Sequence, residues 1–412
     1  MPEFDFLSLD LKVVDDKIQG TANGLLAPLV QMQLQRFLNV LNGLKVIAHR
    51  GDALVYNLYN PPQPTKAGMR ALVRKLNETI TGKVVPATSN LSITHKCHCK
   101  CVHCSADPFI DPSRKELTTD EIKTVVDDAL DLGSSLVIFV GGEPLIHPDI
   151  FELIRYVDKD RAMPMIFTNG WLLEESAEKL AEAGLATLNI SIDSSEPELH
   201  DEMRRVKGLY KRAFAGARKC REVGILTGIS TYAHHQSLKS GQLEKLLKMA
   251  QDEGFHEVTI FDCIPSGRFL KDPSVMLTAD EKKQVVELAM KYHEMDHPMG
   301  VVAQAIVNSE IGVGCFGAYA QFYMTAYGDI NPCDFNPVRF GNVREKSLKE
   351  IWYEMISHPD FSYKHRTCRM QTPSYRAKFI DVLPENPKLP VDIKEIERLR
   401  AEKEKAAQTA GN

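Results

Sequence analysis

Four of the nine cysteines fall in residues 97–104, which read Cys-His-Cys-Lys-Cys-Val-His-Cys. Cysteines this close along the chain make poor disulfide partners for one another, and the N-terminal MPEFDFLSLD lacks the basic-then-apolar order of a secretory signal. The cluster therefore indicates metal binding. Taken as Cys97-x3-Cys101-x2-Cys104, it places three thiolates around one loop. Three protein ligands to a [4Fe–4S] cube leave one iron open, and an open iron can bind a substrate or a cofactor.

A zinc site with Cys99 as the fourth ligand is the alternative interpretation of this run. Tetrahedral zinc usually takes two well-separated Cys-x2–4-Cys pairs, which the run does not offer, so the spacing favours an iron–sulfur cluster. In that interpretation Cys99 points away from the cluster as a spare thiol. A non-catalytic zinc or iron–sulfur protein stays open as a second class of function, which metal and sulfide analysis would separate from an enzyme.

The elements that would position this loop alternate between strands and helices from Ser89 to about Ile306. Six candidate strands are rich in apolar and β-branched residues: 90–94, 136–140, 164–168, 187–193, 226–232 and 257–263. Strand–helix alternation predicts parallel strands with right-handed crossovers. Six units are too few for an eightfold barrel, so we expect an α/β fold, a partial (β/α)6 TIM-type barrel. Its active residues should lie at the C-terminal ends of the strands.

The sequence divides into four parts: an N-terminal extension (1–88), this core (89–306), a segment rich in Gly, Cys and aromatic residues (307–375) and a charged tail (376–412). The extension shows helical spacing over 25–41, a hairpin pattern over 45–59 around a sharp turn, and a second helix over about 66–80. Residues 391–412 predict a solvated helix that frays.

The cysteine spacing directly after a first strand resembles the signature of radical S-adenosylmethionine (SAM) enzymes. Further motifs of that family follow in order at strand ends: Gly141-Gly142-Glu143-Pro144, Thr168-Asn169-Gly170, Ser191-Ile192-Asp193 and Pro265-Ser266-Gly267-Arg268. The resemblance covers about residues 89–375. It implies that a one-electron reduction, from an external flavodoxin- or ferredoxin-like donor, cleaves SAM to a 5′-deoxyadenosyl radical that takes hydrogen from an unactivated C–H bond.

The resemblance also implies roles for individual residues. Cys97, Cys101 and Cys104 would hold the catalytic cluster, whose open iron chelates the methionine part of SAM. Gly141 and Gly142 would let backbone approach the ligand, because they carry no Cβ. The remaining predicted contacts are Glu143 to the ammonium group, Asn169 and Ser191 to the ribose, and Arg204 to the carboxylate. For Arg204 a solvated charge beside Arg205 is an equal alternative. Asp193 is a further cofactor-binding candidate, and a cap on the next helix is its alternative.

Three more cysteines, Cys315, Cys333 and Cys368, follow the core. The pattern Cys-x12-Gly-x4-Cys, followed by GNVREKSLKEIW at 341–352, resembles the SPASM and twitch extensions of radical SAM enzymes. Full SPASM domains have seven cysteines, and the usual second cysteine of the last pair is Gln371 here. The resemblance therefore implies one auxiliary [4Fe–4S] cluster whose fourth iron binds substrate, water or a non-cysteine group. A decayed domain with merely buried cysteines is the alternative.

The charge balance, 50 Lys and Arg against 55 Asp and Glu for a net −5, gives no reason to expect nucleic acid as a partner. No apolar run reaches the roughly 18–20 residues that span a bilayer, and we expect a cytoplasmic protein. We favour a small-molecule or lipid substrate; a ribosomal peptide, bound by the extension, is the alternative. The apolar face of residues 25–41 could touch a membrane, but its polar face has few Lys and Arg, so packing onto the barrel is favoured.

Overall fold

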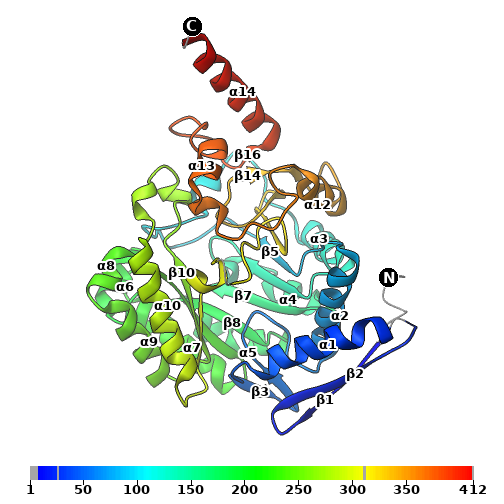
Figure 1. Cartoon of the computed structure of the whole chain (residues 1–412). Coiled ribbons are helices and arrows are strands. Elements are labelled where there is room, and N and C mark those ends of the chain that lie inside the picture. Colours follow the sequence, from blue (N-terminus) through cyan, green and yellow to red (C-terminus); the bar gives the residue numbers. More distant parts are fainter. Residues whose placement is uncertain (1–7, 26, 310–311, 411–412) are drawn as a thin grey trace.

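The computed structural model describes residues 8–25, 27–309 and 312–410. Its centre is one ten-stranded sheet in the order β11-β10-β9-β8-β7-β6-β5-β12-β13-β15, with helices covering its outer face (Figure 1). The neighbouring strands from β5 to β11 are all parallel: β5 Thr88–Ser92, β6 Leu136–Val140, β7 Met163–Thr168, β8 Thr187–Ser191, β9 Leu226–Ala233, β10 Glu257–Asp262 and β11 Gly300–Ala303. The predicted α/β fold is confirmed, and within the described ranges the sheet does not close into a barrel.

All six predicted core strands are present, within a few residues of the expected bounds. The four-residue β11 was not predicted, because its short Gly-Val-Val-Ala segment offers too few positions for a pattern. The helices of the core are α3 Thr119–Leu132, α4 Ile150–Tyr156, α5 Leu173–Glu182, α6 Pro197–Arg204, α7 Leu209–Glu222, α8 His235–Lys239, α9 Gln242–Asp252, α10 Ala279–Glu294 and α11 Gln304–Val307.

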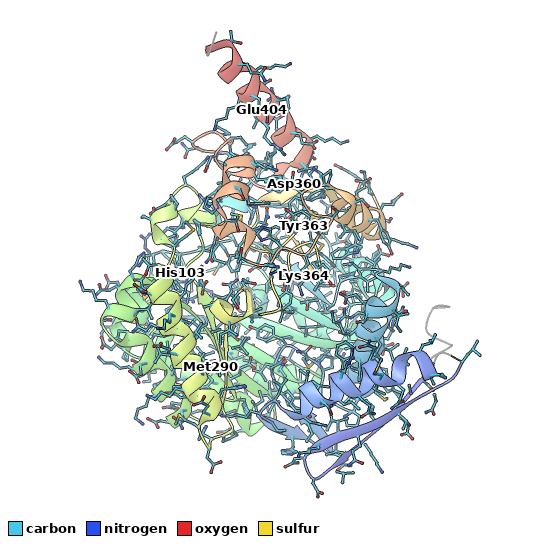
Figure 2. All side chains as sticks on the ribbon, in the orientation of Figure 1. His103, Met290, Asp360, Tyr363, Lys364 and Glu404 are labelled. Carbon is cyan, nitrogen blue, oxygen red and sulfur yellow. The ribbon has the colours of Figure 1, made fainter. Side chains whose placement is uncertain are left out.

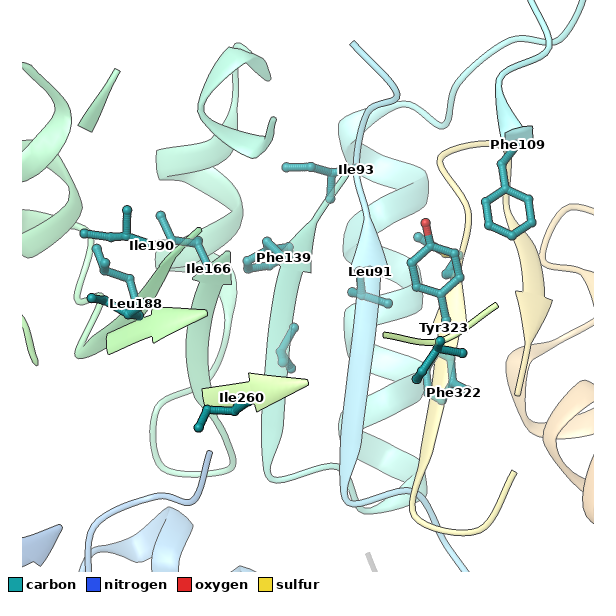
Figure 3. Packing of buried hydrophobic residues seen from close by; sticks show 14 of the residues in the cluster. Leu91, Ile93, Phe109, Phe139, Ile166, Leu188, Ile190, Ile260, Phe322 and Tyr323 are labelled. Carbon is teal, nitrogen blue, oxygen red and sulfur yellow. The ribbon is translucent and has the colours of Figure 1, made fainter. Parts of the chain in front are cut away.

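The core lies between the sheet and these helices. Figure 3 shows Leu91, Phe139 and Ile166 on the neighbouring strands β5, β6 and β7, and all three are fully buried. A parallel sheet with both faces covered needs apolar residues in consecutive positions, which explains the continuous run Leu-Val-Ile-Phe-Val of β6. Because such strands are held on both faces, the loops at their C-terminal ends are fixed relative to one another.

The N-terminal part is a small module beside the sheet. Its elements are β1 Ser8–Val14, β2 Lys17–Asn23, α1 Ala27–Asn42, β3 Ala48–Arg50, β4 Ala53–Val55 and α2 Lys66–Thr81. Both predicted helices and the second hairpin are confirmed. The β1–β2 hairpin was missed, although Asp15-Asp16, both with positive φ, form the kind of two-residue turn that favours a hairpin.

The apolar face of α1 packs inside this module. The expectation that it packs onto the barrel is therefore wrong. Val30, Leu34 and Leu38 are buried against β2 and α2, in one cluster with Ile18 and Leu76. The opposite face of α1 exposes Leu29, Met32 and Val40. No helix in the described ranges is both long enough and apolar enough to span a bilayer.

The C-terminal part extends the central sheet. Its elements are β12 Gln321–Met324, β13 Asp329–Asn331, β14 Val338–Arg339, β15 Gly341–Asn342, α12 Leu348–Ser357, α13 Pro373–Phe379, β16 Val391–Asp392 and α14 Ile393–Ala410. β12 pairs in parallel with β5, the strand that leads into the cysteine loop. The predicted tail helix is α14, which projects from the body (Figure 1). Residues 411–412, where fraying was expected, lie outside the described ranges, and the four domain boundaries stay predictions.

Candidate active site

The cysteine loop begins directly after β5 and is held by main-chain hydrogen bonds on two sides. On one side, Gly142 N–H donates to the Thr94 carbonyl at 2.7 Å and Glu143 N–H donates to the Lys96 carbonyl at 2.8 Å. On the other side, Lys100 and Val102 N–H donate to the last two carbonyls of α6, at 3.3 and 3.1 Å. The loop is thus fixed between the end of β6 and the end of α6.

Gly141 and Gly142 are required by this contact. A Cβ on Gly141 would stand 2.3 Å from the Thr94 carbonyl oxygen, and one on Gly142 would stand 2.4 Å from that of Lys96. The sequence placed the close approach at the ligand. In the structure it is an approach of two backbone segments of this chain, and it brings the Gly-Gly turn against the cysteine loop.

Replacing Gly142 by Ala is expected to destabilise the protein by about 1–3 kcal/mol, the usual cost of overpacking, because the methyl group meets backbone oxygens that cannot move freely. Chemical denaturation would measure the change. Gly43→Ala is the matched control, since the nearest atom to a Cβ there lies at an ordinary 3.5 Å. Equal free energies of unfolding for the two variants would contradict the prediction.

The thiols of the loop lie in different surroundings, and all are free. Cys97 is exposed, Cys101 is buried and Cys104 is half-buried. A hydrogen bond with Cys99, aided by the charge of Arg204, lowers the pKa of Cys101 to about 6 against the opposing effect of burial. Burial raises the pKa of Cys104. The thiolate, the more reactive form of a cysteine, is therefore favoured at Cys101 relative to an ordinary thiol.

Cys99 lies close to the neighbouring cysteines of the loop, and its orientation relative to a bound cluster stays a prediction. Its thiol hydrogen-bonds with both Cys97 and Cys101, and its N–H donates to the Cys97 Sγ at 3.4 Å. The reason is that the loop curls back on itself after Cys97, so alternate side chains do not point to opposite faces as they would in a strand. Among the described residues, no three His, Cys, Asp or Glu side chains converge as a site for a single metal ion.

Glu143 joins the ends of two neighbouring strands. Its fully buried carboxylate accepts hydrogen bonds from Leu145 N–H at 3.1 Å, Thr168 Oγ1 at 2.7 Å and Asn169 N–H at 2.7 Å. Burial raises its pKa to about 7, although these hydrogen bonds act in the opposite direction. Three of its acceptor positions are therefore used within the protein, which fixes the turn after β7 beside the Gly-Gly turn after β6.

Asn169 and Ser191 lie at the ends of the next two strands. Asn169 is buried; its Nδ2 lies 3.8 Å from the Cys97 Sγ, and its Oδ1 accepts from Trp171 N–H at 2.9 Å. Ser191 is the last residue of β8 and is half-buried. The Pro265–Arg268 loop after β10 also meets the cysteine loop, since Arg268 N–H donates to the Cys104 carbonyl at 3.2 Å. The structure thus brings the strand-end motifs to one edge of the sheet.

Arg204 is neither solvated nor free, so the surface-charge alternative is wrong. Its Nε and Nη2 bind the two carboxylate oxygens of Asp193 at 2.6 and 2.8 Å, and its Nη1 lies 3.7 Å from the Cys101 Sγ. Burial alone would raise the pKa of Asp193, but the Arg204 guanidinium holds it well below its usual range. Asp193 does not cap the next helix, because α6 begins after Glu196 and the Asp193 carboxylate is taken by Arg204.

The three C-terminal cysteines gather in a second group. Cys315 and Cys368 are buried and Cys333 is half-buried. Burial raises the pKa of Cys333 well above its ordinary value, and the nearby charges of Cys315 and Cys368 raise it further. The same two causes, burial and the charge of Cys315, raise the pKa of Cys368 to about 12. The main chain fixes the first of them, since Cys315 N–H donates to the His365 carbonyl at 2.8 Å.

Gln371, which stands where the family has a further cysteine, takes part in a separate contact. Its Oε1 accepts from Lys282 Nζ at 2.7 Å and its Nε2 donates to Asp262 Oδ2 at 3.2 Å. Both ends of its amide group are therefore bound to the core, and Gln371 is not presented to the cysteine group.

Asp334 is a candidate site residue that the sequence did not reveal. Burial raises the pKa of its carboxyl group to about 6, and its own backbone N–H is its one hydrogen-bond partner in the described ranges. Burial and then the charges of Asp334 and Cys104 raise the pKa of Tyr323. Asp334 and Cys104 therefore both lie near Tyr323, and Asp334 also lies near Cys333. A lone Asp beside a Cys carries no pattern that could have indicated this.

Tyr59 brings the N-terminal module to the same interior. Its hydroxyl donates to Thr259 Oγ1 at 3.0 Å and accepts from Asn189 Nδ2 at 2.9 Å, while Leu58 N–H donates to Glu257 Oε2 at 3.1 Å. These residues belong to the early parts of β8 and β10. The segment after β4 thus closes the N-terminal end of the sheet, opposite the cysteine loop.

The outer surface carries a hollow that lies apart from the strand ends. A shallow hollow on α10 is lined by Glu287, Met290, Lys291, Glu294 and Met295. Figure 2 shows Met290 on the helical face, well away from Tyr363 and Lys364 of the C-terminal part. None of the residues that line this hollow belongs to either cysteine group.

Comparison with known proteins agrees with this geometry. Residues 91–250 match the model of the Radical SAM superfamily, and residues 315–370 match that of an iron–sulfur cluster-binding domain, SPASM. An AdoMet-dependent heme synthase of Methanosarcina barkeri is 30% identical over 282 residues, covering 63% of this chain and 80% of that protein. A PqqA peptide cyclase of Rhizobium meliloti is 26% identical over 289 residues, covering 66% of this chain and 75% of that protein.

Among solved structures, Streptococcus suis SuiB bound to precursor peptide SuiA aligns with a TM-score of 0.54 at 19% identity, covering 81% of this chain and 78% of that one, which shows a shared fold. The chain belongs to the radical SAM superfamily, and the resemblance seen in its motifs is confirmed. Within that superfamily its C-terminal segment is a SPASM domain. It is accordingly an enzyme that uses SAM and a [4Fe–4S] cluster, and its SPASM domain implies auxiliary iron–sulfur clusters.

Proposed function

We propose that Cys97, Cys101 and Cys104 hold the catalytic [4Fe–4S] cluster, and that Cys315, Cys333 and Cys368 hold one auxiliary cluster. The donor set supports this: the loop carries four free thiols, its three proposed ligands and Cys99, and the second group carries three. The charges of neighbouring thiols affect one another within each group. A four-iron cube takes one thiolate on each of several irons, so its ligands do not converge on one point as those of zinc do. The same proposal keeps residues 89–306 and 307–375 as the two cluster-binding domains.

When bound, these groups supply one-electron chemistry and a 5′-deoxyadenosyl radical that removes hydrogen from a C–H bond. The residues of the chain do the rest. Gly141, Gly142 and Glu143 fix the strand ends, while Asn169 and Ser191 lie at the neighbouring ends where SAM would contact them. Asp334 would accept a proton from the substrate, because its carboxylate lies beside the second cysteine group and no cation is among the causes that shift its pKa.

We infer a peptide substrate, so that the protein acts as a maturase of ribosomal peptides. The small-molecule or lipid substrate that the sequence favoured finds less support, because relatives of this chain include peptide cyclases. The N-terminal module supplies the observation that carries the inference. Its β1–β2 sheet has two strands only, and β1 pairs with β2 alone in the described ranges, which leaves one edge of β1 open.

An open edge of this kind is suited to bind an extended peptide as a third strand. The two-residue turn makes Val14 and Lys17 a directly hydrogen-bonded pair, and such pairs alternate along an antiparallel ladder. The N–H and C=O groups of Leu9, Leu11 and Val13 therefore face the open edge. Three alternate residues span enough backbone to fix the register of a bound segment.

A porphyrin substrate is the second candidate. It is favoured by the M. barkeri heme synthase, at 30% identity over 80% of its length, and by a Fe-coproporphyrin III synthase of the same organism, at 26% identity over 80% of its length. A porphyrin would make no use of the open edge of β1, which is why we place it second.

The test combines both candidates in one assay. Anaerobically prepared enzyme containing its clusters is mixed with dithionite, SAM and either a short peptide encoded beside its gene or an iron porphyrin. Peptide maturation predicts a product that differs in mass from the peptide and forms in step with 5′-deoxyadenosine. A changed porphyrin absorption spectrum with an unchanged peptide mass would overturn the inference in favour of the second candidate.

A further inference from the structure

We propose that Arg204 sets the reduction potential of the cluster held at Cys101 by donating an N–H to that sulfur, and that Asp193 orients the guanidinium and partly offsets its charge. This rests on the proposed function in one respect only, namely that Cys101 is a cluster ligand. It differs from the expected role of this arginine, which was to bind the carboxylate of SAM.

The guanidinium has a partner on each of its three nitrogens. Nε and Nη2 form a two-pronged contact with Asp193, at 2.6 and 2.8 Å, which matches the planar geometry of guanidinium and carboxylate. The third nitrogen, Nη1, is 3.7 Å from the Cys101 Sγ, within hydrogen-bond range for sulfur. A carboxylate of SAM could take the fork of Arg204 only by displacing Asp193.

The backbone holds Arg204 and Cys101 together as one rigid unit. Lys100 N–H donates to the Arg204 carbonyl at 3.3 Å, and Val102 N–H donates to the Met203 carbonyl at 3.1 Å. These two hydrogen bonds lie on either side of Cys101 in the sequence. The distance between the guanidinium and the sulfur is therefore set by main-chain contacts as well as by the side chain.

The charges of this group are shielded from water. The side chains of Arg204 and Asp193 are 11% and 1% exposed, so bulk solvent screens their effect on the sulfur only weakly. Two histidines also face Asp193. His103 Nε2 lies 3.7 Å from its Oδ2, and His200 Nδ1 accepts its N–H at 3.2 Å. Of the two, only His103 faces the carboxylate itself, and Arg204 remains the bidentate partner of that carboxylate.

Hydrogen bonds to the sulfurs and nearby charge are two of the levers that set the potential of an iron–sulfur cluster. Reduction adds an electron, so a buried positive charge beside a ligand sulfur stabilises the reduced form and raises the potential. A buried negative charge has the opposite effect. Arg204 and Asp193 therefore act on the cluster with opposite signs, and the separate removal of each gives opposite results.

The experiment measures the reduction potential of the catalytic cluster by EPR-monitored titration of the full-length holoenzyme in the absence of SAM. The signal of that cluster is identified as the one that changes when SAM is added to a parallel sample. We expect Arg204→Gln to make reduction at least tenfold less favourable, a shift of 59 mV or more to lower potential for a one-electron couple. Asp193→Asn should shift the potential upward, and the double variant should return towards the wild type.

Two further variants make the result specific. Arg205→Gln removes a neighbouring but exposed charge and should leave the potential unchanged. Arg204→Lys keeps the charge without the fork and should shift the potential less than Arg204→Gln does. If Arg204→Gln fails to retain its iron, the other two variants decide: the potential should rise in Asp193→Asn and should fall only slightly in Arg204→Lys.

An unchanged potential in Arg204→Gln, combined with weaker binding of SAM, would overturn the proposal and return Arg204 to the carboxylate of SAM. A shift of the potential in the same direction for Arg204→Gln and Asp193→Asn would also overturn it. Such a result is expected if both substitutions only loosen the loop, because the charge of the removed side chain would then not decide the direction. Wild-type protein that lacks a four-iron signal altogether would refute the proposed function instead, which keeps the two failures distinguishable.

Discussion

Replacing Cys97, Cys101 or Cys104 by Ala should reduce formation of 5′-deoxyadenosine from SAM and dithionite to the level of a protein-free sample. Each of the three thiolates would hold a different iron, and a cube held at two corners only is not retained in a form that binds SAM. Chromatography of the anaerobic reaction measures the nucleoside directly, and iron and sulfide analysis shows whether the cluster is lost with it.

The chain offers a matched control for this series. Cys220 is a fully buried cysteine of α7, distant in sequence from both cysteine groups. Its replacement by Ala is the same substitution as in the three loop variants. Cys220→Ala should keep both its iron and its SAM cleavage. Full turnover in any of the three loop variants would contradict the assignment of the catalytic cluster, as would equal loss of activity in the control.

Replacing Asp334 by Asn should separate SAM cleavage from product formation. The amide keeps the size of the side chain but cannot accept a proton as a carboxylate does, so product formation should fall by roughly 10²-fold or more. SAM cleavage should stay near the wild-type rate, because Asp334 lies beside Tyr323 and Cys333 and is not part of the loop that we propose as the holder of the catalytic cluster. The ratio of modified peptide to 5′-deoxyadenosine measures the effect.

Asp280→Asn is the control for this second prediction, since it makes the same change at an exposed position in the first turn of α10. Asp334→Glu should recover part of the lost product formation, because it restores a carboxylate. If product and nucleoside fall together in Asp334→Asn, the carboxyl group serves the structure of the site and not the transfer of a proton.

Much of the fold could be predicted because the parallel core obeys local rules. Its strands are apolar runs bounded by helices, and Thr118 and Glu121 form the capping box that the sequence indicates at the start of α3. The family motifs could be placed at strand ends because they directly follow these apolar runs. β12 escaped prediction as a member of this sheet, because its pairing with β5 joins residues more than 200 positions apart and no local pattern encodes such a partner.

The side-chain network was less predictable than the loops that carry it. Arg204 and Asp193 stand eleven positions apart, and their spacing is compatible with a capped helix bearing a solvated charge. Only the packing of α6 against the cysteine loop in the structure shows that the two side chains bind each other. The neighbours of Cys99 and Asp334 could not be predicted for a similar reason: a curled loop decides those of Cys99, and a long-range approach decides those of Asp334.

The pairing of β12 with β5 has a consequence for how the two cysteine groups are held apart. Cys97 follows β5 and Cys333 follows β13, two strands that flank β12 on its opposite sides. One proposed ligand of each cluster would thus follow a strand of the same hydrogen-bonded sheet, which restricts changes in the distance between these two ligands. Truncating the protein after residue 306 would remove β12 and leave β5 as an edge strand unpaired on one side, which can pair with other chains and aggregate.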